Sequence, residues 1–342
     1  MPPDPRRKLA WVLVWIFLSA SDGALGQDNP RVPAPDVFTS DQNVLSSEEN
    51  SSQSEWGLAC TDVFERAQLK RVIQAKQWPK AKQIANGLIE RCPNTGIGQY
   101  WVGIIEFKQG NFIEALHNFE AAVDRAPTVP RVHLNLGVAY LMINQFKLFE
   151  DEMLWLTTHD PKNPLPFYYL GRYYSKRFDD PQEKASMFFE QALVRNPTDY
   201  QSRYHLGYIY ELRGAIEMAR KEYQAAWQEV SSEKGNYSLP LQGLARLCFS
   251  EEQTAQGLKY AEQAVWVDAK QSGNYLVSGK LYLQAQDYSK SVAALKRAAE
   301  LEPINPTPHY LLARAYRESG QRAEAEKEIA LFAKIKLAYR NE

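Results

Sequence analysis

The chain has 342 residues, of which 44% are hydrophobic and 24% are charged, and its formal net charge is −1. This is the composition of a globular protein that is long enough for one large or two medium domains. Because neither sign of charge dominates, the composition argues against nucleic acid or an anionic membrane surface as the main partner.

The N-terminus has the three parts of a secretory signal peptide. Basic residues at positions 6–8 precede the apolar run LAWVLVWIFLSA, residues 9–20, and the small residues Ala24 and Gly26 follow it. The run is short for a membrane-spanning helix, which needs about 20 apolar residues. The pattern predicts a signal peptide over residues 1–26, cleaved after Gly26, and a secreted or periplasmic protein. The alternative is an uncleaved N-terminal anchor that tethers the protein to a membrane.

The segment that follows, residues 27–58, has the composition of a linker. It begins with several prolines and continues with a stretch rich in Ser, Glu, Asn and Gln. Too few apolar residues are present to offset the entropy lost on ordering, so the segment is expected to be a disordered spacer. The folded part is then expected to span residues 59–342.

An internal repeat organises the folded part. Its first sign is a glycine series, with Val, Leu or Ser before each glycine and, in the last four cases, Tyr three residues later. The steps between these glycines are 34, 34, 36 and 72 residues, and the last step divides at Ala245. A second, mostly alanine series and a proline series keep the same period, which predicts a solenoid. The three series are Gly103, Gly137, Gly171, Gly207 and Gly279; Ala81, Ala115, Phe149, Ala185, Ala219, Gly257, Ser291 and Ala325; and Pro93, Pro127, Pro161, Pro197 and Pro303.

One copy of the repeat carries the complete pattern, namely Phe167, Leu170, Gly171, Tyr174, Ala185, Phe189, Ala192 and Pro197. This pattern resembles the tetratricopeptide-repeat family, and the resemblance covers nearly all of the chain after the spacer. It implies an all-α fold, a right-handed superhelical solenoid of about eight antiparallel helix pairs. The repeats are expected at residues 62–95, 96–129, 130–163, 164–199, 200–237, 238–271, 272–305 and 306–339.

Elementary packing rules agree with the resemblance. Each repeat reads as two amphipathic helices joined by a short turn, such as the turn at Gly110. The small residues of the first two series remove bulk where two antiparallel helices meet, and the prolines end the second helix. One helix pair cannot bury its apolar face alone, so stacked neighbours must supply the core.

The sequence carries no recognisable catalytic motif. It contains five histidines, none of them four residues from another His or Cys on an expected helix. The phosphate-binding, nucleophile-elbow and zinc-protease motifs do not occur either. We therefore expect a protein that is not an enzyme and that uses no cofactor or metal.

Two cysteines stand at neighbouring ends of the first expected helix pair. Cys60 lies just before its first helix and Cys92 at the end of its second. Because an exported protein meets an oxidising compartment, a Cys60–Cys92 disulfide is predicted. The alternative is a pair of unbridged thiols.

The family resemblance also implies a binding surface, because the first helices of such repeats line a concave groove. In this chain the groove positions are apolar at first, as at Ile104 and Leu134, and carry cations beside tyrosines from the fourth repeat onward. Such a surface suits an extended protein or peptide segment with acidic groups. The alternative is a solvated face with incidental charges. The candidate residues are Tyr168, Arg172, Tyr204, Tyr208, Arg246, Lys280, Tyr310 and Arg314.

The third repeat departs from the pattern in its second helix. Met153, Leu154 and Trp155 give this helix more apolar residues than one buried stripe needs. Two interpretations are local repacking of the core and an exposed apolar patch for a second partner contact.

The expected function is that of a non-catalytic protein-interaction scaffold in an exported or periplasmic setting, with no nucleic-acid partner and no stable membrane insertion after signal cleavage. One alternative is an envelope polysaccharide-binding module that uses Tyr168, Tyr204 and Tyr208. Another is a non-catalytic subunit of an envelope enzyme complex that docks through the region of Trp155. The sequence leaves the partner and the oligomeric state open.

Overall fold

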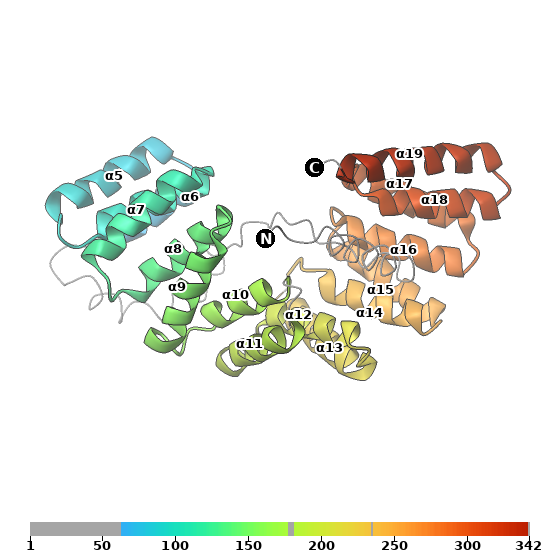
Figure 1. Ribbon diagram of the computed structural model, residues 1–342, viewed down its shortest axis with the longest axis horizontal. Helices are drawn as coiled ribbons and strands as arrows, with labels where there is room; N and C mark the ends of the chain where they lie inside the picture. Colours follow the sequence, from blue (N-terminus) through green and yellow to red (C-terminus); the bar gives the residue numbers. More distant parts are fainter. Residues whose placement is uncertain (1–62, 177–180, 234, 341–342) are drawn as a thin grey trace, which may run out of the picture. The chain divides into compact units, whose positions relative to one another are not determined.

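The computed structural model describes residues 63–176, 181–233 and 235–340; the predicted signal peptide, the spacer and Cys60 lie outside these residues. The described residues form sixteen α-helices and no β-strand, which confirms the all-α repeat architecture (Figure 1). The helices are α4 Val63–Gln74, α5 Trp78–Arg91, α6 Ile97–Gln109, α7 Phe112–Arg125, α8 Pro130–Met142, α9 Phe146–His159, α10 Leu165–Tyr174, α11 Pro181–Arg195, α12 Tyr200–Leu212, α13 Ile216–Ser232, α14 Leu239–Ser250, α15 Thr254–Val267, α16 Ser272–Gln284, α17 Tyr288–Leu301, α18 Pro306–Glu318 and α19 Arg322–Arg340.

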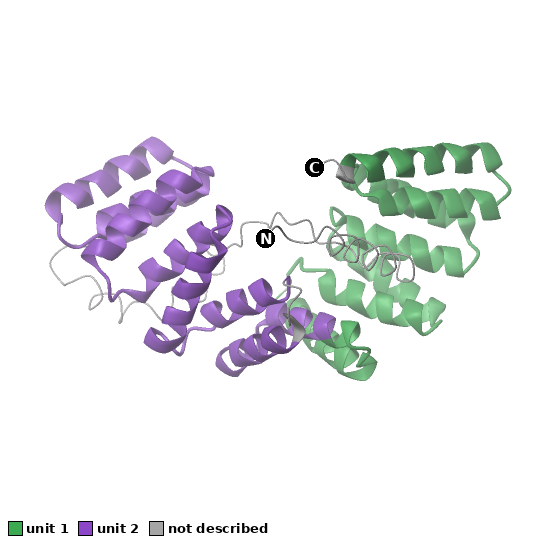
Figure 2. Cartoon of the chain, in the orientation of Figure 1, with its two compact units in different colours: residues 1–33, 210–342 green, residues 34–209 purple. Residues whose placement is uncertain are grey.

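These helices divide between two compact units (Figure 2). The N-terminal unit ends at Ile209 and holds α4 to α11 and most of α12. The C-terminal unit begins at Tyr210 and holds the end of α12 and α13 to α19. The division falls inside one helix, where the repeat pattern of the sequence gives no sign of a boundary.

The turn within a helix pair is closed by one residue in the left-handed conformation. Gly110, Gly214 and Gly320 have φ angles of 85°, 72° and 82° after α6, α12 and α18. The backbone N–H of Gly110 donates to carbonyls of the last turn of α6, which satisfies groups that a helix end leaves unpaired. At four other turns a non-glycine residue adopts this conformation: Lys76, Asn144, Glu252 and Gln286.

The glycine series marks the closest approach of two antiparallel helices. A Cβ on Gly171 of α10 would lie 2.8 Å from the ring of Phe189 on α11, and a Cβ on Gly103 would lie 2.6 Å from Phe119. Most members of the alanine series, which lies on the second helix of each pair, are fully buried, among them Ala115. The glycines therefore leave room for large side chains of the second helix, such as Phe119 and Phe189, while the alanine series is buried separately.

Prolines follow the second helix of several pairs, as expected. Pro127, Pro161, Pro197 and Pro303 lie in the turns after α7, α9, α11 and α17. In the described part of the chain, none of the helices is both long and apolar enough to span a membrane.

Candidate partner-binding surfaces

The first predicted groove tyrosine, Tyr168 on α10, is packed into the N-terminal unit and is only 7% exposed. Its ring centroid lies 5.5, 6.2 and 6.0 Å from those of Tyr169, Phe189 and His205. Burial raises the pKa of the Tyr168 phenol, which stays neutral. Tyr204 on α12 is also buried. Little of either ring is therefore accessible to a ligand, because neighbouring helices cover positions that the repeat pattern placed on an open face.

Arg172, one turn after Tyr168, carries positive charge in the same region. It is half-buried, and its guanidinium carbon lies 5.7 Å from the centroid of the Tyr168 ring. It makes no ion pair with any residue that the structure describes. Burial and the charges of Arg172 and Lys176 hold the pKa of His205 well below its usual range, so this histidine is neutral. Tyr208 is half-buried on α12.

In the C-terminal unit, Arg246 on α14 is held by a carboxylate. Its Nε and Nη2 donate to Oε1 and Oε2 of Glu211 at 3.0 and 2.8 Å, and Nη2 also donates to the Tyr223 hydroxyl at 3.1 Å. The Tyr223 hydroxyl donates to the same carboxylate at 2.6 Å. Such a bidentate pair fixes the guanidinium and neutralises much of its charge. The structure thus differs from the open cation that the sequence led us to expect at Arg246.

Lys280 on α16 is another of the predicted groove cations of the C-terminal unit, and it is half-buried. Burial, and after it the charge of Arg246, lower the pKa of the Lys280 ammonium to about 8. An acidic group brought close to this ammonium would favour its charged form.

The last two predicted groove residues lie on α18 and are the most accessible. Tyr310 is 50% exposed, and its ring centroid lies 5.7 Å from that of Phe332 on α19. Arg314 is exposed, and its Nε donates to Oε1 of Glu318 at 2.7 Å. An exposed pair one helical turn apart contributes little to stability and is screened by salt.

The predicted apolar patch on α9 is not present as a patch. Met153 is fully buried, and a Cβ on Gly137 of α8 would lie 2.3 Å from the end of its side chain. Met153 therefore occupies the space left by the missing side chain of Gly137, which supports the interpretation of local repacking of the core. Leu154 is exposed, whereas Trp155 is half-buried. Including Met153 in a partner surface was wrong, because helix periodicity could not tell which apolar residues faced α8.

Trp155 lies between two histidine rings. Its ring is stacked on His133 of α8 at a centroid distance of 3.8 Å and on His159 at 3.9 Å. His133 Nδ1 lies 2.7 Å from Oε2 of Glu152, and its Nε2 lies 2.9 Å from the carbonyl oxygen of Pro127. Burial alone would lower the pKa of His133, but these bonds to two acceptors outweigh it and raise the pKa. His133 thus links α8 to α9 and to the turn after α7.

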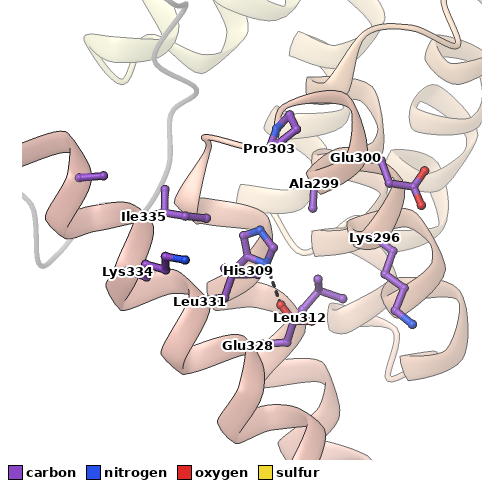
Figure 3. Close-up of a pocket in the computed structure, with 11 residues that line it drawn as sticks. Lys296, Ala299, Glu300, Pro303, His309, Leu312, Glu328, Leu331, Lys334 and Ile335 are labelled. Atoms are coloured by element: carbon purple, nitrogen blue, oxygen red, sulfur yellow. Dashed lines mark hydrogen bonds and ion pairs between the residues drawn. The ribbon is translucent and has the colours of Figure 1, made fainter.

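An open pocket of about 580 Å³ lies among α17, α18 and α19 in the C-terminal unit (Figure 3). Figure 3 shows His309 near its centre, with Ala299 and Lys296 of α17 on one side and Leu331 and Lys334 of α19 on the other. His309 Nδ1 lies 2.7 Å from Oε2 of Glu328. The pocket was not predicted from the sequence.

A second surface feature that sequence reasoning missed is Trp266 on α15, which is 85% exposed. No repeat position marks it as unusual, so only its accessibility reveals it. The sequence did carry a sign of the two His–Glu pairs, because the 19-residue separation of His133 and Glu152 recurs between His309 and Glu328. Among the described residues, no group of three or more His, Cys, Asp or Glu side chains is placed to hold a metal ion.

The predicted disulfide involves one described residue. Cys92 is buried at the end of α5, and Cys60 lies outside the described residues, so the bridge stays a prediction. Cys248 is a free, buried thiol, and burial raises its pKa. Cys248 lies three residues after Ala245, at the place where other repeats have a tyrosine, and it packs in the core.

Curated relatives share sequence with most of this chain but are much longer. Superkiller complex protein 3 of Mus musculus is 23% identical over 267 residues, which is 76% of this chain and 17% of that protein. Tetratricopeptide repeat protein 37 of Xenopus laevis is 22% identical over 236 residues, 68% of this chain and 15% of that protein. The chain thus spans about a sixth of the length of these relatives.

Solved structures of low sequence identity share the fold. Cut9 with Hcn1, from the APC/C hetero-tetramer, aligns with a TM-score of 0.61 at 16% identity, over 72% of this chain and 48% of that chain. A tetratricopeptide repeat protein from Parabacteroides merdae aligns with a TM-score of 0.55 at 15% identity, over 73% and 97%. The pilus biogenesis factor PilW aligns with a TM-score of 0.53 at 13% identity, over 63% and 96%.

Family models agree with these likenesses. Models described as Tetratricopeptide repeat match residues 103–154, 185–233 and 282–334. The matched segments include helices of both compact units. Sequence matches and shared architecture together support the tetratricopeptide-repeat family for this chain.

Proposed function

We propose that the chain is a non-catalytic interaction scaffold that binds an extended, acidic segment of a partner protein. Tetratricopeptide proteins are generally scaffolds of this kind, and stacked helix pairs offer long surfaces to protein partners. The observation that carries the acidic partner is Lys280, a half-buried ammonium beside Arg246 whose pKa is lowered to about 8. A carboxylate of the partner would stabilise the charged form of this ammonium, which burial and the charge of Arg246 disfavour.

The other cations have different parts in this proposal. Glu211 holds Arg246 in place and neutralises much of its charge, so Arg246 contributes a fixed set of N–H donors. In the N-terminal unit, Arg172 is positioned over Tyr168 and offers a second contact for an acidic group. Tyr310 offers open aromatic surface on α18.

The test uses the fluorescein-labelled peptide Ala-Leu-Glu-Leu-Glu-Leu-Glu-Ala and fluorescence anisotropy. We expect binding to weaken as the pH rises from about 7 to about 9, because Lys280 loses its proton over this range. Lys280→Met should lower the affinity about tenfold at neutral pH, the size of one charge-assisted contact. Lys280→Arg should keep the affinity and remove the pH dependence, because a guanidinium stays charged.

Lys259→Met is the matched control, because Lys259 is exposed on α15 and should not change binding. Binding by the Lys280→Met variant with unchanged affinity would exclude this position as the acidic site. If the wild-type protein does not bind the peptide at any pH, the result would contradict the proposed acidic partner.

We also propose an exported setting for the scaffold. The support is the basic, apolar and small-residue pattern of residues 1–26. The predicted Cys60–Cys92 bridge would fit the same oxidising compartment.

A second candidate function is that of a structural subunit in a larger assembly. Superkiller complex protein 3 is named for a complex, and Trp266 offers an exposed aromatic anchor of the kind that protein interfaces use. In this case the protein should co-purify with partners from its source, and Trp266→Ser should release one of them. Sugar binding has less support, because Tyr168 and Tyr204 are buried.

A further inference from the structure

The last helix pair, α18 and α19, carries an apolar face at the surface of the C-terminal unit. Tyr310 is 50% exposed and Ile329 is 47% exposed, and Phe332 is half-buried with its ring centroid 5.7 Å from that of Tyr310. We call these three residues the end face. A terminal pair of a helical solenoid usually has a polar outer surface that water can cover, so this apolar face is unusual.

The preceding repeat shows what covers such a face. One repeat length earlier, the residues equivalent to the end face are Leu276, Leu295 and Ala298. All three are buried, and they form one core cluster with Leu311, Leu312 and Ala315 of α18. Helix α18 packs against both α16 and α17. The equivalent surface of the seventh repeat is thus covered by an amphipathic helix, which is the first helix of the next pair.

Other repeats confirm that these positions belong to a covered surface. The residues equivalent to Ile329 and Phe332 are fully buried in four of them, namely Phe119 and Ala122, Met153 and Leu156, Tyr223 and Ala226, and Ala261 and Ala264. Ile329 therefore differs from its equivalents in exposure but not in character, since all of them are apolar or aromatic. The end face keeps the composition of a surface that a further helix covers.

An inner junction also shows how charges meet between one first helix and the next. Glu211 of α12 accepts hydrogen bonds from Arg246 of α14 at 3.0 and 2.8 Å. By repeat position, the residue of α18 equivalent to Glu211 is Arg317, which is exposed. A helix that covers the end face therefore meets a cation where Arg246 meets a carboxylate. Lys336, whose Nζ lies 5.6 Å from the centroid of the Phe332 ring, adds a second positive charge.

We propose that the end face binds an amphipathic α-helix of a partner protein, with a carboxylate of that helix in contact with Arg317. Contact with Tyr310, Ile329 and Phe332 supplies the apolar burial, and the charge pair selects the partner. A second copy of this chain fits less well, because two end faces would bring Arg317 and Lys336 close to the same cations. This binding does not depend on the function proposed above.

The test uses two fluorescein-labelled peptides of residues 305–321, which include the helix N-cap Asn305. One has the native sequence and the other carries Arg314→Glu, which places a carboxylate at the position equivalent to Arg246. In anisotropy titrations with the full chain, we expect the Glu peptide to bind at least about tenfold more tightly than the native peptide. Arg317→Glu in the full chain should reverse this preference, because the native peptide then meets the opposite charge.

Ile329→Glu in the full chain should weaken binding of the Glu peptide at least about tenfold, because it places a charge within the apolar contact. Ala338→Glu is the matched control, because it adds the same charge on the opposite side of α19, at the pocket between α17 and α19. Both positions are exposed, so both variants should fold, which circular dichroism checks. Lys280→Met should leave this binding unchanged, which separates the end face from the site proposed above.

Four results of these titrations would each overturn the proposal: equal binding of the two peptides, an unchanged preference in Arg317→Glu, unchanged binding by Ile329→Glu, and no binding of the Glu peptide by the wild-type chain. Light scattering tests the other occupant. A wild-type dimer that Ile329→Glu converts to a monomer would also overturn the proposal, because a second copy of the chain would then cover the end face.

Discussion

Gly171 shows at the scale of one residue how a missing side chain sets the distance between two helices. A Cβ there would meet the ring of Phe189 at 2.8 Å, and Phe189 is itself fully buried and has little room to move. Gly87 on α5 is the opposite case, because nothing lies within 4 Å of its Cβ position.

We expect Gly171→Leu to lower the free energy of unfolding by about 1–3 kcal/mol through overpacking. Gly87→Ala should raise it by roughly 0.5–1 kcal/mol, because alanine favours the helix and finds no clash. Urea denaturation of both variants measures these changes. An unchanged stability of Gly171→Leu would contradict the close approach of α10 and α11.

His133 gives the fold a dependence on pH. Burial lowers its pKa, but the bonds to Glu152 and to the Pro127 carbonyl outweigh burial, so the net pKa in the folded state is raised. A raised pKa means that His133 binds its proton more tightly in the folded protein than in the unfolded chain. Its stabilisation is therefore complete below the unfolded value of about 6.5 and is lost as the pH rises through the folded pKa.

We expect His133→Gln to destabilise the protein more at about pH 6 than at about pH 8.5, because the wild type loses its advantage as His133 is deprotonated. Urea denaturation at both pH values gives the two differences. His117→Gln, at an exposed position on α7, should show no such change between them. Equal destabilisation by His133→Gln at both pH values would mean that its charge is not involved.

At the scale of elements, the turns between paired helices share one conformation but not one residue type. Gln286 after α16 has φ 60°, whereas Gly214 after α12 has φ 72° and open space around its Cβ position. In this left-handed conformation a non-glycine residue costs roughly 1–2 kcal/mol more than glycine. Part of this cost is offset, because glycine loses more conformational entropy when the chain folds.

We expect Gln286→Gly to stabilise the C-terminal unit by roughly 0.5–1 kcal/mol and Gly214→Ala to destabilise it by about the same amount. Differential scanning calorimetry of the two variants measures the changes. Shifts of the same sign in both variants would contradict the left-handed turn as their cause.

At the scale of the whole molecule, export and the disulfide make a joint prediction. The mature protein isolated from its source should begin at Gln27 and contain a Cys60–Cys92 bridge, which would stabilise the first repeat by about 3–4 kcal/mol. Intact-mass analysis before and after reduction measures both features. A mass that includes residues 1–26 would favour the uncleaved anchor, and alkylation of both cysteines without reduction would exclude the bridge.

The sequence by itself determined the fold of this protein, because the features that specify it are local. Glycine, alanine and proline recur with a period near 34 residues, and each acts on the helix that contains it or on the next one. The all-α repeat architecture could be predicted for this reason. Gly171 facing Phe189 is an example, since both residues belong to one repeat.

Only the tertiary structure decided which side chains remain accessible, because that depends on packing between repeats. Glu211 reaches Arg246 across 35 positions of sequence, and Tyr168 is covered by His205 of the following repeat. The repeat pattern predicts which face of a helix carries such residues. It does not identify the residue of another repeat that pairs with them or buries them. The pocket at His309 likewise depends on packing. Leu331 lines this pocket, whereas the equivalent position in the N-terminal unit is Trp155, whose ring is stacked on His133.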